Sequence, residues 1–218
     1  CTNTGVISVT TGSLVHVGGI AGMYRLSYGA KLDRCVNGAE NMTESLFAYN
    51  ATAGQTRLGG VLGHCHNSSG KLELVGCYNH SPINISHAGL RQVGGLCSAV
   101  AKGVELSVDD CHNTGDITLG NVASSHSDKK QFGGLFGYLG SESGKTFEIK
   151  NSTNTGDVET SVSAGGETQV AGITGYLGAY VSLSKCVNEG AVSGKNSAFK
   201  PRIGGIAGVA DATGTKIL

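Results

Sequence analysis

The 218-residue sequence has no tryptophan and only two prolines, and aromatic residues make up 6% of it. Large rings are therefore not expected to fill the core, and we expect it to be built from Val, Ile, Leu, Ala and Cys. Basic and acidic residues balance at 16 against 16. A neutral sum gives no electrostatic reason to expect nucleic acid or an anionic membrane as partner. No apolar run approaches the ~20 residues that span a bilayer, and no N-terminal signal segment is present, so we expect no membrane insertion.

Glycine, by contrast, is abundant, with 36 residues. Much glycine with little proline predicts tight turns and close backbone approaches, and it argues against a disordered linker or a collagen. The chain also begins at Cys1 and not at Met. We therefore expect residues 1–218 to form a single repeat array that is a segment of a longer protein.

The first of two internal repeats is an apolar residue, two small residues and two more apolar or small residues, usually followed by Gly. It occurs six times, at 17–22, 58–63, 93–97, 132–137, 170–175 and 203–208. The Gly pair interrupts the alternation of a strand, because Val17 and Ile20 would fall on opposite faces of a flat one. A bulge or sharp bend is expected there.

The second repeat is Cys-x-Asn, in which Cys is replaced only once, by Ser152. Equivalent residues of stacked parallel coils lie one strand spacing apart, ~4.8 Å. A carboxamide carries both a donor and an acceptor, so a column of Asn side chains can hydrogen-bond to itself. We therefore predict a structural ladder of six residues: Asn3, Asn37, Asn79, Asn113, Asn154 and Asn188.

Between the two signatures the apolar pattern is short and close to period two, as in 71–75 and 181–184, and no stretch keeps a helical period. Each repeat is expected to hold two or three short strands. The sequence predicts an all-β repeat solenoid, a right-handed parallel β-helix of about six coils. The alternative is a six-bladed β-propeller. The shorter Asn-to-Asn interval, 34 residues as from Asn3 to Asn37, is however short for a four-stranded blade, which usually needs ~40 or more.

The recurrent cysteines favour a structural role. Seven is an odd number, and equivalent cysteines of successive coils point the same way and not at each other. No close Cys pair suits a metal, and the most metal-like stretch, His64-Cys65-His66, occurs in one repeat only. We predict small buried hydrophobes, with no metal and no cofactor.

A column of long polar residues precedes the Gly pairs, and we expect it on an exposed sheet face. Such columns are more often only a solvated face, but this one is a candidate surface for an extended glycan or a protein. Two tyrosines that share one repeat slot would add stacking surface. The candidate binding face is Arg57, Gln92, Gln131, Gln169, Arg202, Tyr138 and Tyr176, and His16 heads the polar column in the first repeat.

The motifs of serine hydrolases and zinc peptidases are missing from the sequence, and no catalytic residue is predicted. The alternative is a carbohydrate-active β-helix enzyme. Its reaction needs two carboxylates about 5 to 9.5 Å apart. The acids that adjacent coils can bring together are Asp110, Asp116 and Asp157, although acids beside turns are ordinary solvated residues.

Together the two signatures resemble the GLUG repeats, best at Gly133–Gly137 with Asn154–Val158 and at Gly204–Gly208. These repeats occur in large bacterial surface proteins, including Bacteroides-type adhesins and non-catalytic regions of IgA-peptidase-like proteins. The copies around Asn37 and Asn79 depart from the pattern. The resemblance implies an extracellular module on the bacterial surface, acting as adhesin, stalk or spacer, with a host or matrix glycan or protein as partner. It implies no reaction.

Overall fold

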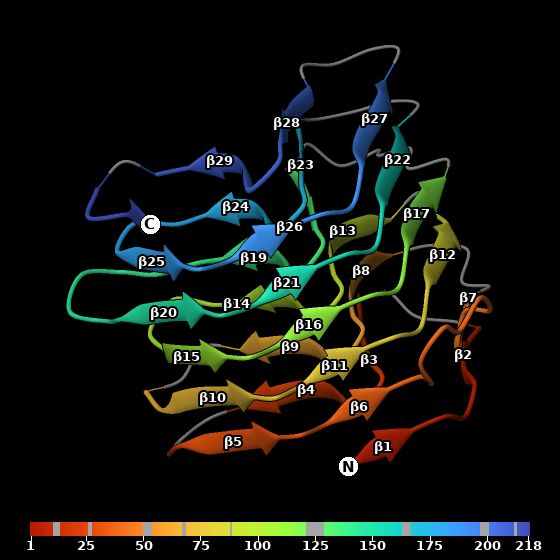
Figure 1. Cartoon of the computed structure of the whole chain (residues 1–218), viewed down its shortest axis with the longest axis horizontal. Coiled ribbons are helices and arrows are strands. Elements are labelled where there is room, and N and C mark those ends of the chain that lie inside the picture. Colours follow the sequence, from red (N-terminus) through yellow and green to blue (C-terminus); the bar gives the residue numbers. More distant parts are fainter. Residues whose placement is uncertain are drawn as a thin grey trace.

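The computed structural model describes residues 1–10, 14–25, 28–49, 54–66, 69–87, 89–120, 129–162, 167–196, 201–211 and 213–218. These residues form thirty strands, β1 to β30, and they contain no helix. The described part of the chain thus holds no helix suited to crossing a membrane. The chain winds as a right-handed parallel β-helix of six successive passes, with five strands in each (Figure 1).

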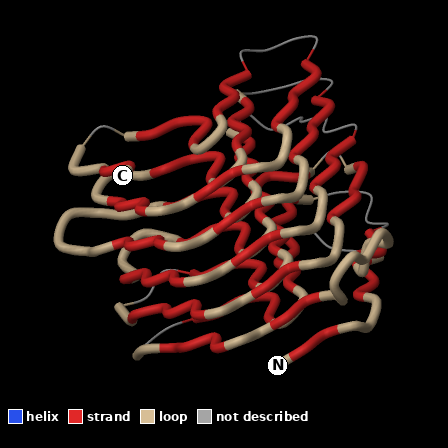
Figure 2. Tube along the Cα trace, in the orientation of Figure 1, coloured by secondary structure: helices blue, strands red, loops and turns tan. Residues whose placement is uncertain are grey.

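Apart from β7 and β12, which belong to separate sheets, each strand pairs in parallel with its equivalent in the next pass. A propeller blade pairs consecutive strands, so the alternative fold is wrong. The prediction of two or three strands per repeat was also too low. Two-residue strands such as β1 and β6 are too short to show a period, and the Gly bend divides what reads as one segment into two (Figure 2).

The Asn sheet runs through the middle of the stack. Its strands are β1 (Thr2–Asn3), β6 (Val36–Asn37), β11 (Tyr78–Asn79), β16 (His112–Asn113), β21 (Thr153–Asn154) and β26 (Val187–Asn188). The chain then enters the β12 sheet, with strands β12 (Ile83–Ser86), β17 (Ile117–Gly120), β22 (Val158–Val162) and β27 (Val192–Asn196). In the first two passes this place is taken by the pair β2 (Ile7–Val9) and β7 (Phe47–Tyr49).

The β3 sheet follows, up to the Gly pair. It contains β3 (Leu14–Gly18), β8 (Gln55–Gly59), β13 (Leu90–Gly94), β18 (Lys130–Gly133), β23 (Thr168–Ala171) and β28 (Pro201–Gly204). Beyond the Gly pair lies the β4 sheet: β4 (Ala21–Arg25), β9 (Leu62–His66), β14 (Cys97–Val100), β19 (Phe136–Leu139), β24 (Thr174–Leu177) and β29 (Ala207–Ala210). The β5 sheet then leads to the next Asn strand: β5 (Ala30–Asp33), β10 (Lys71–Val75), β15 (Glu105–Asp109), β20 (Phe147–Lys150), β25 (Val181–Ser184) and β30 (Lys216–Ile217).

The six recurrent Asn residues form a continuous hydrogen-bonded ladder. Nδ2 of each of the first five donates to Oδ1 of the next Asn of the ladder, at 2.7 to 2.9 Å. The second N–H of Asn113 donates to the carbonyl of Gly115, two residues on, at 2.8 Å, and Asn79 and Asn154 do the same with Ser81 and Gly156. Asn37, Asn79, Asn113 and Asn154 are fully buried, so the ladder satisfies carboxamides that would otherwise be costly to bury.

The Gly pair and the Asn ladder are in direct contact across the coil. A Cβ at the second Gly of each of the first five repeats would overlap the carboxamide carbon of the next Asn, for example Gly95 with Asn113. The first Gly serves the bend itself, because a Cβ on Gly94 would overlap the carbonyl oxygen of Cys97. The fifth repeat has Ala171 in that first position. The second Gly, the position against which the Asn carboxamides pack, is present in all six copies.

This contact divides the interior into two cores. One lies between the β4 and β5 sheets and includes Leu72, Phe136 and Phe147. The other lies between the β3 and β12 sheets and includes Leu58 and Phe132. Each coil is therefore an elbow with two apolar arms (Figure 1), and the predicted bend lets Val17 enter one core while Ile20 packs on the other.

The cysteines are free thiols, and Cys35, Cys77 and Cys111 are buried beside the Asn ladder. The Cys111 thiol donates to the carbonyl of Asp109, two residues back, at 3.4 Å. The Ser152 hydroxyl makes the same bond to Lys150, at 2.8 Å. Ser can replace Cys in this column because both side chains are small and can donate to that carbonyl.

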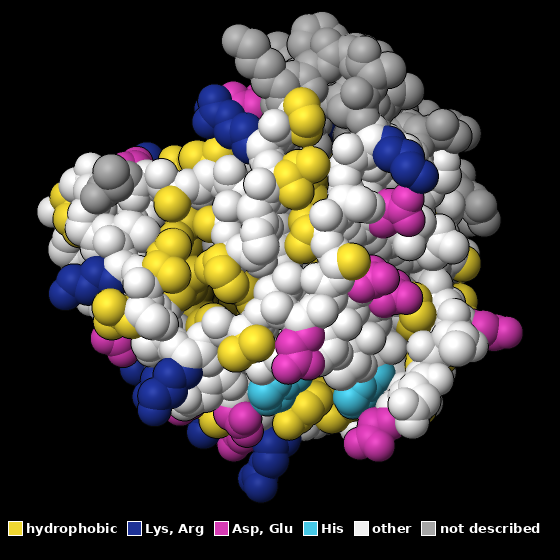
Figure 3. Space-filling model, turned by 45° about the horizontal axis from the view of Figure 1, so that its top comes forward, with side chains coloured by type: hydrophobic (Ala, Val, Ile, Leu, Met, Phe, Trp, Pro, Cys, Tyr) yellow, Lys and Arg dark blue, Asp and Glu magenta, His cyan; other side chains and the backbone are white. Residues whose placement is uncertain are grey.

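The last coil leaves apolar surface at the end of the stack. Figure 3, which turns that end forward, shows hydrophobic side chains gathered there and charged side chains of both signs scattered around them. Val187, Ile203, Ile217 and Leu218 are exposed large hydrophobic residues of this coil. The scatter of both signs is consistent with the zero net charge of the sequence.

The contact between the second Gly and the Asn ladder gives a matched pair of variants. Gly95→Ala should destabilise the protein by about 3 kcal/mol or more, because the new methyl overlaps both Asn113 and the carbonyl of Gly134. Gly205→Ala, at the equivalent position of the last repeat, meets nothing within 4 Å, and should change stability by less than about 1 kcal/mol. Urea unfolding monitored by circular dichroism measures both, and equal losses would contradict the packing described.

Candidate binding groove

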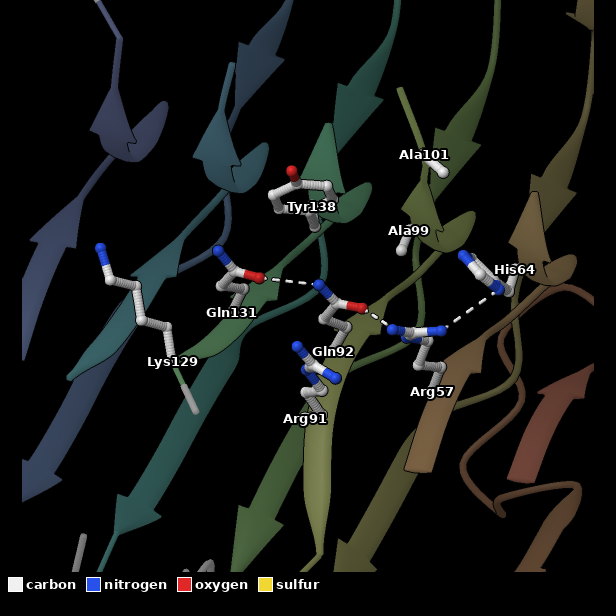
Figure 4. A pocket seen from close by; sticks show the side chains of 9 residues that line it. All are labelled: Arg57, His64, Arg91, Gln92, Ala99, Ala101, Lys129, Gln131 and Tyr138. Carbon is white, nitrogen blue, oxygen red and sulfur yellow. Dashed lines mark hydrogen bonds between the residues drawn. The ribbon is translucent and has the colours of Figure 1, made fainter. Parts of the chain in front are cut away.

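The β3 and β4 sheets meet at the Gly bend, and the inside of this bend holds a cavity of about 480 Å³. We call it the elbow groove. One wall comes from the β3 sheet and the other from the β4 sheet (Figure 4). Its lining residues are Arg57, Arg91, Gln92, Lys129 and Gln131 on the first wall, and His64, Ala99, Ala101 and Tyr138 on the second.

The polar column of the sequence forms a second ladder along the floor of this groove. Arg57 Nε donates to Gln92 Oε1 at 2.7 Å, Gln92 Nε2 to Gln131 Oε1 at 2.8 Å, and Gln131 Nε2 to Gln169 Oε1 at 3.1 Å. Beyond it, Glu167 accepts from Gln169 at 2.6 Å and pairs with Arg202 at 3.2 Å. The column is thus a hydrogen-bonded chain across four coils that is held at its far end by a carboxylate.

The expectation that this column lies on an exposed face was wrong for its glutamines. Gln92, Gln131 and Gln169 are between 0% and 5% exposed, whereas Arg202 is exposed and Arg57 half-buried. The reason is the elbow angle, which brings β4-sheet side chains over the β3 sheet. A ladder satisfies buried carboxamides, so the glutamines form the floor and the longer residues around them form the contact surface.

The tyrosines extend the second wall. Tyr138 and Tyr176 occupy equivalent positions of β19 and β24, and their rings stack with centroids 5.2 Å apart at an interplanar angle of 13°. Tyr138 lines the cavity, and Tyr176 continues the column beyond it. Burial raises the pKa of both phenols, so both stay neutral hydrogen-bonding groups on a flat aromatic surface.

Arg91 enters the groove through an irregularity in the repeat. Leu90 pairs with Thr56 and Gln92 pairs with Arg57, which leaves Arg91 as an extra residue in β13. Leu90 and Val93 both face the β3–β12 core, so the two residues between them are both on the groove side. The Arg91 guanidinium donates to Gln55 Oε1 at 2.7 Å. Bulges of this kind often re-aim a side chain at a functional site.

At the N-terminal end of the groove, His64 is nearly buried, with 4% exposure. Its ring stacks on His16 at 4.8 Å, and its Nδ1 lies 3.3 Å from Arg57 Nη1. Burial, with the nearby positive charge of Arg57, lowers the pKa of His64 to about 3. His64 is therefore neutral at physiological pH.

The His64-Cys65-His66 stretch has the alternation expected of a strand. The two imidazoles share a face, with centroids 5.5 Å apart, and Cys65 is buried in the β4–β5 core, where burial raises its pKa to about 12. Among the residues that the structure describes, no three His, Cys, Asp or Glu side chains are grouped to hold a metal.

The three candidate acids lie away from the groove, at turns of the Asn sheet. Asp116 Oδ1 accepts the backbone N–H of Asp157 at 2.9 Å, and Asp157 Oδ1 accepts that of Ala191 at 2.7 Å. Asp110 has a φ of 55°, in the turn position held by Gly76 and Lys185 in other repeats, and lies 3.0 Å from His112. All three are exposed. Two of the carboxylates thus join one coil to the next as hydrogen-bond acceptors.

No protein-family model, curated protein or solved structure matches the chain.

The groove brings together Arg57, Gln92, Gln131 and Tyr138 of the candidate face, with Gln169 and Tyr176 next to them in register. Arg202 lies apart, at the end of the column. Sequence reasoning missed Arg91 and Lys129. A signal for Arg91 is present in Leu90-Arg91-Gln92-Val93, where two polar residues stand between two apolar ones and break the period of two. Lys129 gives no such signal.

The lowered pKa of His64 predicts a specific pH dependence of stability. Since the folded state resists protonation of His64, the stability due to its neutral form is fully present above about pH 6.5 and is lost as the pH falls toward about 3. His64→Ala, which places there the residue that Ala99 supplies in the next coil, should lose less stability between pH 7 and pH 4 than the unmodified protein. Urea midpoints at both pH values measure this, and equal losses in the two proteins would refute the assignment.

Proposed function

We propose that the chain is a non-enzymatic module of a bacterial cell-surface protein of the GLUG-repeat kind, and that it binds an extended glycan in the elbow groove. The observation that carries the proposal is the groove itself, in which a hydrogen-bonding floor and a stacked tyrosine pair run in the direction in which the coils stack. Sugars present hydroxyls at their edges and C–H groups on their faces. Polar side chains beside aromatic rings suit both.

The rigidity of the site supports a binding role. Both walls belong to strands, and the floor is held by hydrogen bonds from Arg57 to Glu167. A ligand therefore has few side chains to order when it binds, which lowers the entropic cost of association. The stacked coils also make the module a stiff spacer, which suits an adhesin or a stalk.

The enzyme alternative has less support. It depends on Asp110, Asp116 and Asp157, two of which accept backbone N–H groups of neighbouring coils. The two roles are separated by incubating the protein with polysaccharides and measuring released sugars. Release that Asp116→Asn abolishes would favour the enzyme.

A glycan array carrying neutral and charged saccharides tests the binding module. The unmodified protein should bind a subset of the glycans, and Tyr138→Ala should weaken that binding about tenfold, because it removes the ring that lines the cavity. Tyr28→Ala is the control, since Tyr28 is 86% exposed and lies outside the groove. Absence of binding to every glycan, or binding that Tyr138→Ala leaves unchanged, would refute the proposal.

A further inference from the structure

The two ends of the stack expose apolar side chains and open strand edges. Apart from Tyr180, every exposed large hydrophobic residue that the structure describes lies in the first or the last coil. Those of the first coil are Val6, Leu14, Met23 and Tyr28, and those of the last are Val187, Ile203, Ile217 and Leu218. The strands of these two coils are also the outermost strands of their sheets, with a described partner on one side only. Edges of this kind are templates for further strands.

The last coil differs from the others at the second Gly of its bend. In each of the first five coils a Cβ at this Gly would overlap the Asn of the following coil, as at Gly172 with Asn188. A Cβ on Gly205 meets no described atom within 4 Å. Asn3, in turn, begins the ladder, and no described Gly bend lies before it. One end of the stack therefore offers the Gly surface, and the other offers the Asn that packs on such a surface in the inner coils.

The Asn ladder has a direction, and its two ends are complementary. In all five contacts Nδ2 donates toward the C-terminal end of the stack. Asn188 Nδ2 donates one N–H to the carbonyl of Gly190 at 2.8 Å, and its second N–H reaches no acceptor among the described residues. Asn3 Oδ1 accepts the backbone N–H of Gly5 at 3.2 Å and has a second lone pair. A donor is thus available at one end of the ladder and an acceptor at the other.

The backbone hydrogen bonds between coils are complementary in the same way. After each Gly pair an N–H donates to the carbonyl of the following coil, as from Ile173 to Ile206 at 3.3 Å. Within the described part of the chain, the N–H of Ile206 therefore has no acceptor and the carbonyl of Ile20 has no donor. At the Asn strand the direction reverses, and the N–H of Glu189 donates back to the carbonyl of Asn154 at 2.8 Å. Each end thus presents donors where the other presents acceptors.

We propose that this chain associates head to tail, with the first coil of one copy stacked on the last coil of another and Asn3 packed against Gly205. The contact repeats the register that joins successive coils within the chain, and it adds a rung to the Asn ladder. Because the two faces differ, each pair keeps one free face of each kind, so the assembly grows beyond a dimer. Such stacking would lengthen a stiff spacer, and it does not depend on the proposed glycan site.

Two residues make this junction weaker than a contact between coils of one chain. Pro201, in the edge strand β28, lacks the N–H with which Lys130 donates to Glu167 of the following coil from the equivalent position. Lys216 occupies a register position that would bring it beside Lys31 of the next copy. The association is therefore expected to be weak and reversible, and to strengthen when salt screens the two like charges.

Two variants of the last coil test the proposal in opposite directions. Gly205→Ala keeps the fold, because its methyl meets no described atom within 4 Å. It would overlap Asn3 of the next copy, and should weaken association about tenfold or more. Lys216→Glu would face Lys31 of the next copy, as Glu73 faces Lys31 within the chain, and should strengthen association about threefold at low salt.

Each variant has a control in the third coil. Gly120→Ala adds a methyl that meets only ordinary contacts, with Ser86 at 3.4 Å or more. Lys102→Glu makes the charge change of the second variant at an exposed position. Neither residue lies in an end coil, so both substitutions should leave association unchanged. Circular dichroism checks that all four variants keep the fold.

Sedimentation velocity of the full chain and each variant, over a concentration series at low and high salt, measures the association. We expect the average mass of the unmodified chain to rise with concentration past that of a dimer, and to rise further at high salt. A chain that stays monomeric throughout overturns the proposal. So does association that stops at a dimer, because two like ends then meet. Association that Gly205→Ala leaves unchanged, or that Lys216→Glu weakens, places the contact elsewhere and also overturns it.

Discussion

The architecture depends on one contact, in which the Asn ladder packs against the second Gly of each bend. The carboxamide of Asn113 reaches across the coil until only a hydrogen atom fits on Gly95. A larger residue there would force the Gly bend and the Asn strand opposite it apart. A side chain without both donor and acceptor would leave its neighbours above and below unsatisfied in the interior. This is why the two sequence signatures recur together, with Asn and the second Gly present in all six copies.

The two cores and the groove follow from this contact between the Asn ladder and the second Gly. It separates the two apolar cores, and it fixes the angle at which the β3 and β4 sheets meet. That angle brings the long side chains of one sheet over the other and forms the elbow groove. The glutamines of the polar column form a second buried ladder. Like the Asn ladder on the opposite surface of the bend, it is held by hydrogen bonds between carboxamides. One constraint therefore accounts for both the stability of the stack and the shape of the candidate site.

Much of the fold can be predicted from the sequence, because repetition multiplies weak signals. Six Asn residues at a common position predict a ladder, and six Gly pairs predict a bend. The number of strands per coil could not be predicted, because a strand of two residues, such as Val36–Asn37, has no period to detect. The two separate cores depend on a contact between residues in different parts of the coil, such as Gly60 and Asn79, and periodicity does not report such contacts.

The site was less predictable than the fold. The polar column and the tyrosines could be found because they repeat, but the burial of Gln131 depends on the angle between two sheets. Arg91 shows the opposite case. It breaks the repeat, so a search for regular positions does not find it. The two successive polar residues between Leu90 and Val93 nevertheless mark it. In a repeat protein the regular positions indicate structure, while the irregular ones are the first places to look for a ligand.

The central claim is tested most directly by hydrogen exchange of the Asn side-chain amides, measured by nuclear magnetic resonance. The account predicts that the Nδ2 protons of Asn79, Asn113 and Asn154 exchange orders of magnitude more slowly than those of exposed Asn84. Protection should fall toward Asn3 and Asn188 at the ends of the ladder. Exchange of the central amides as fast as that of Asn84 would contradict the account.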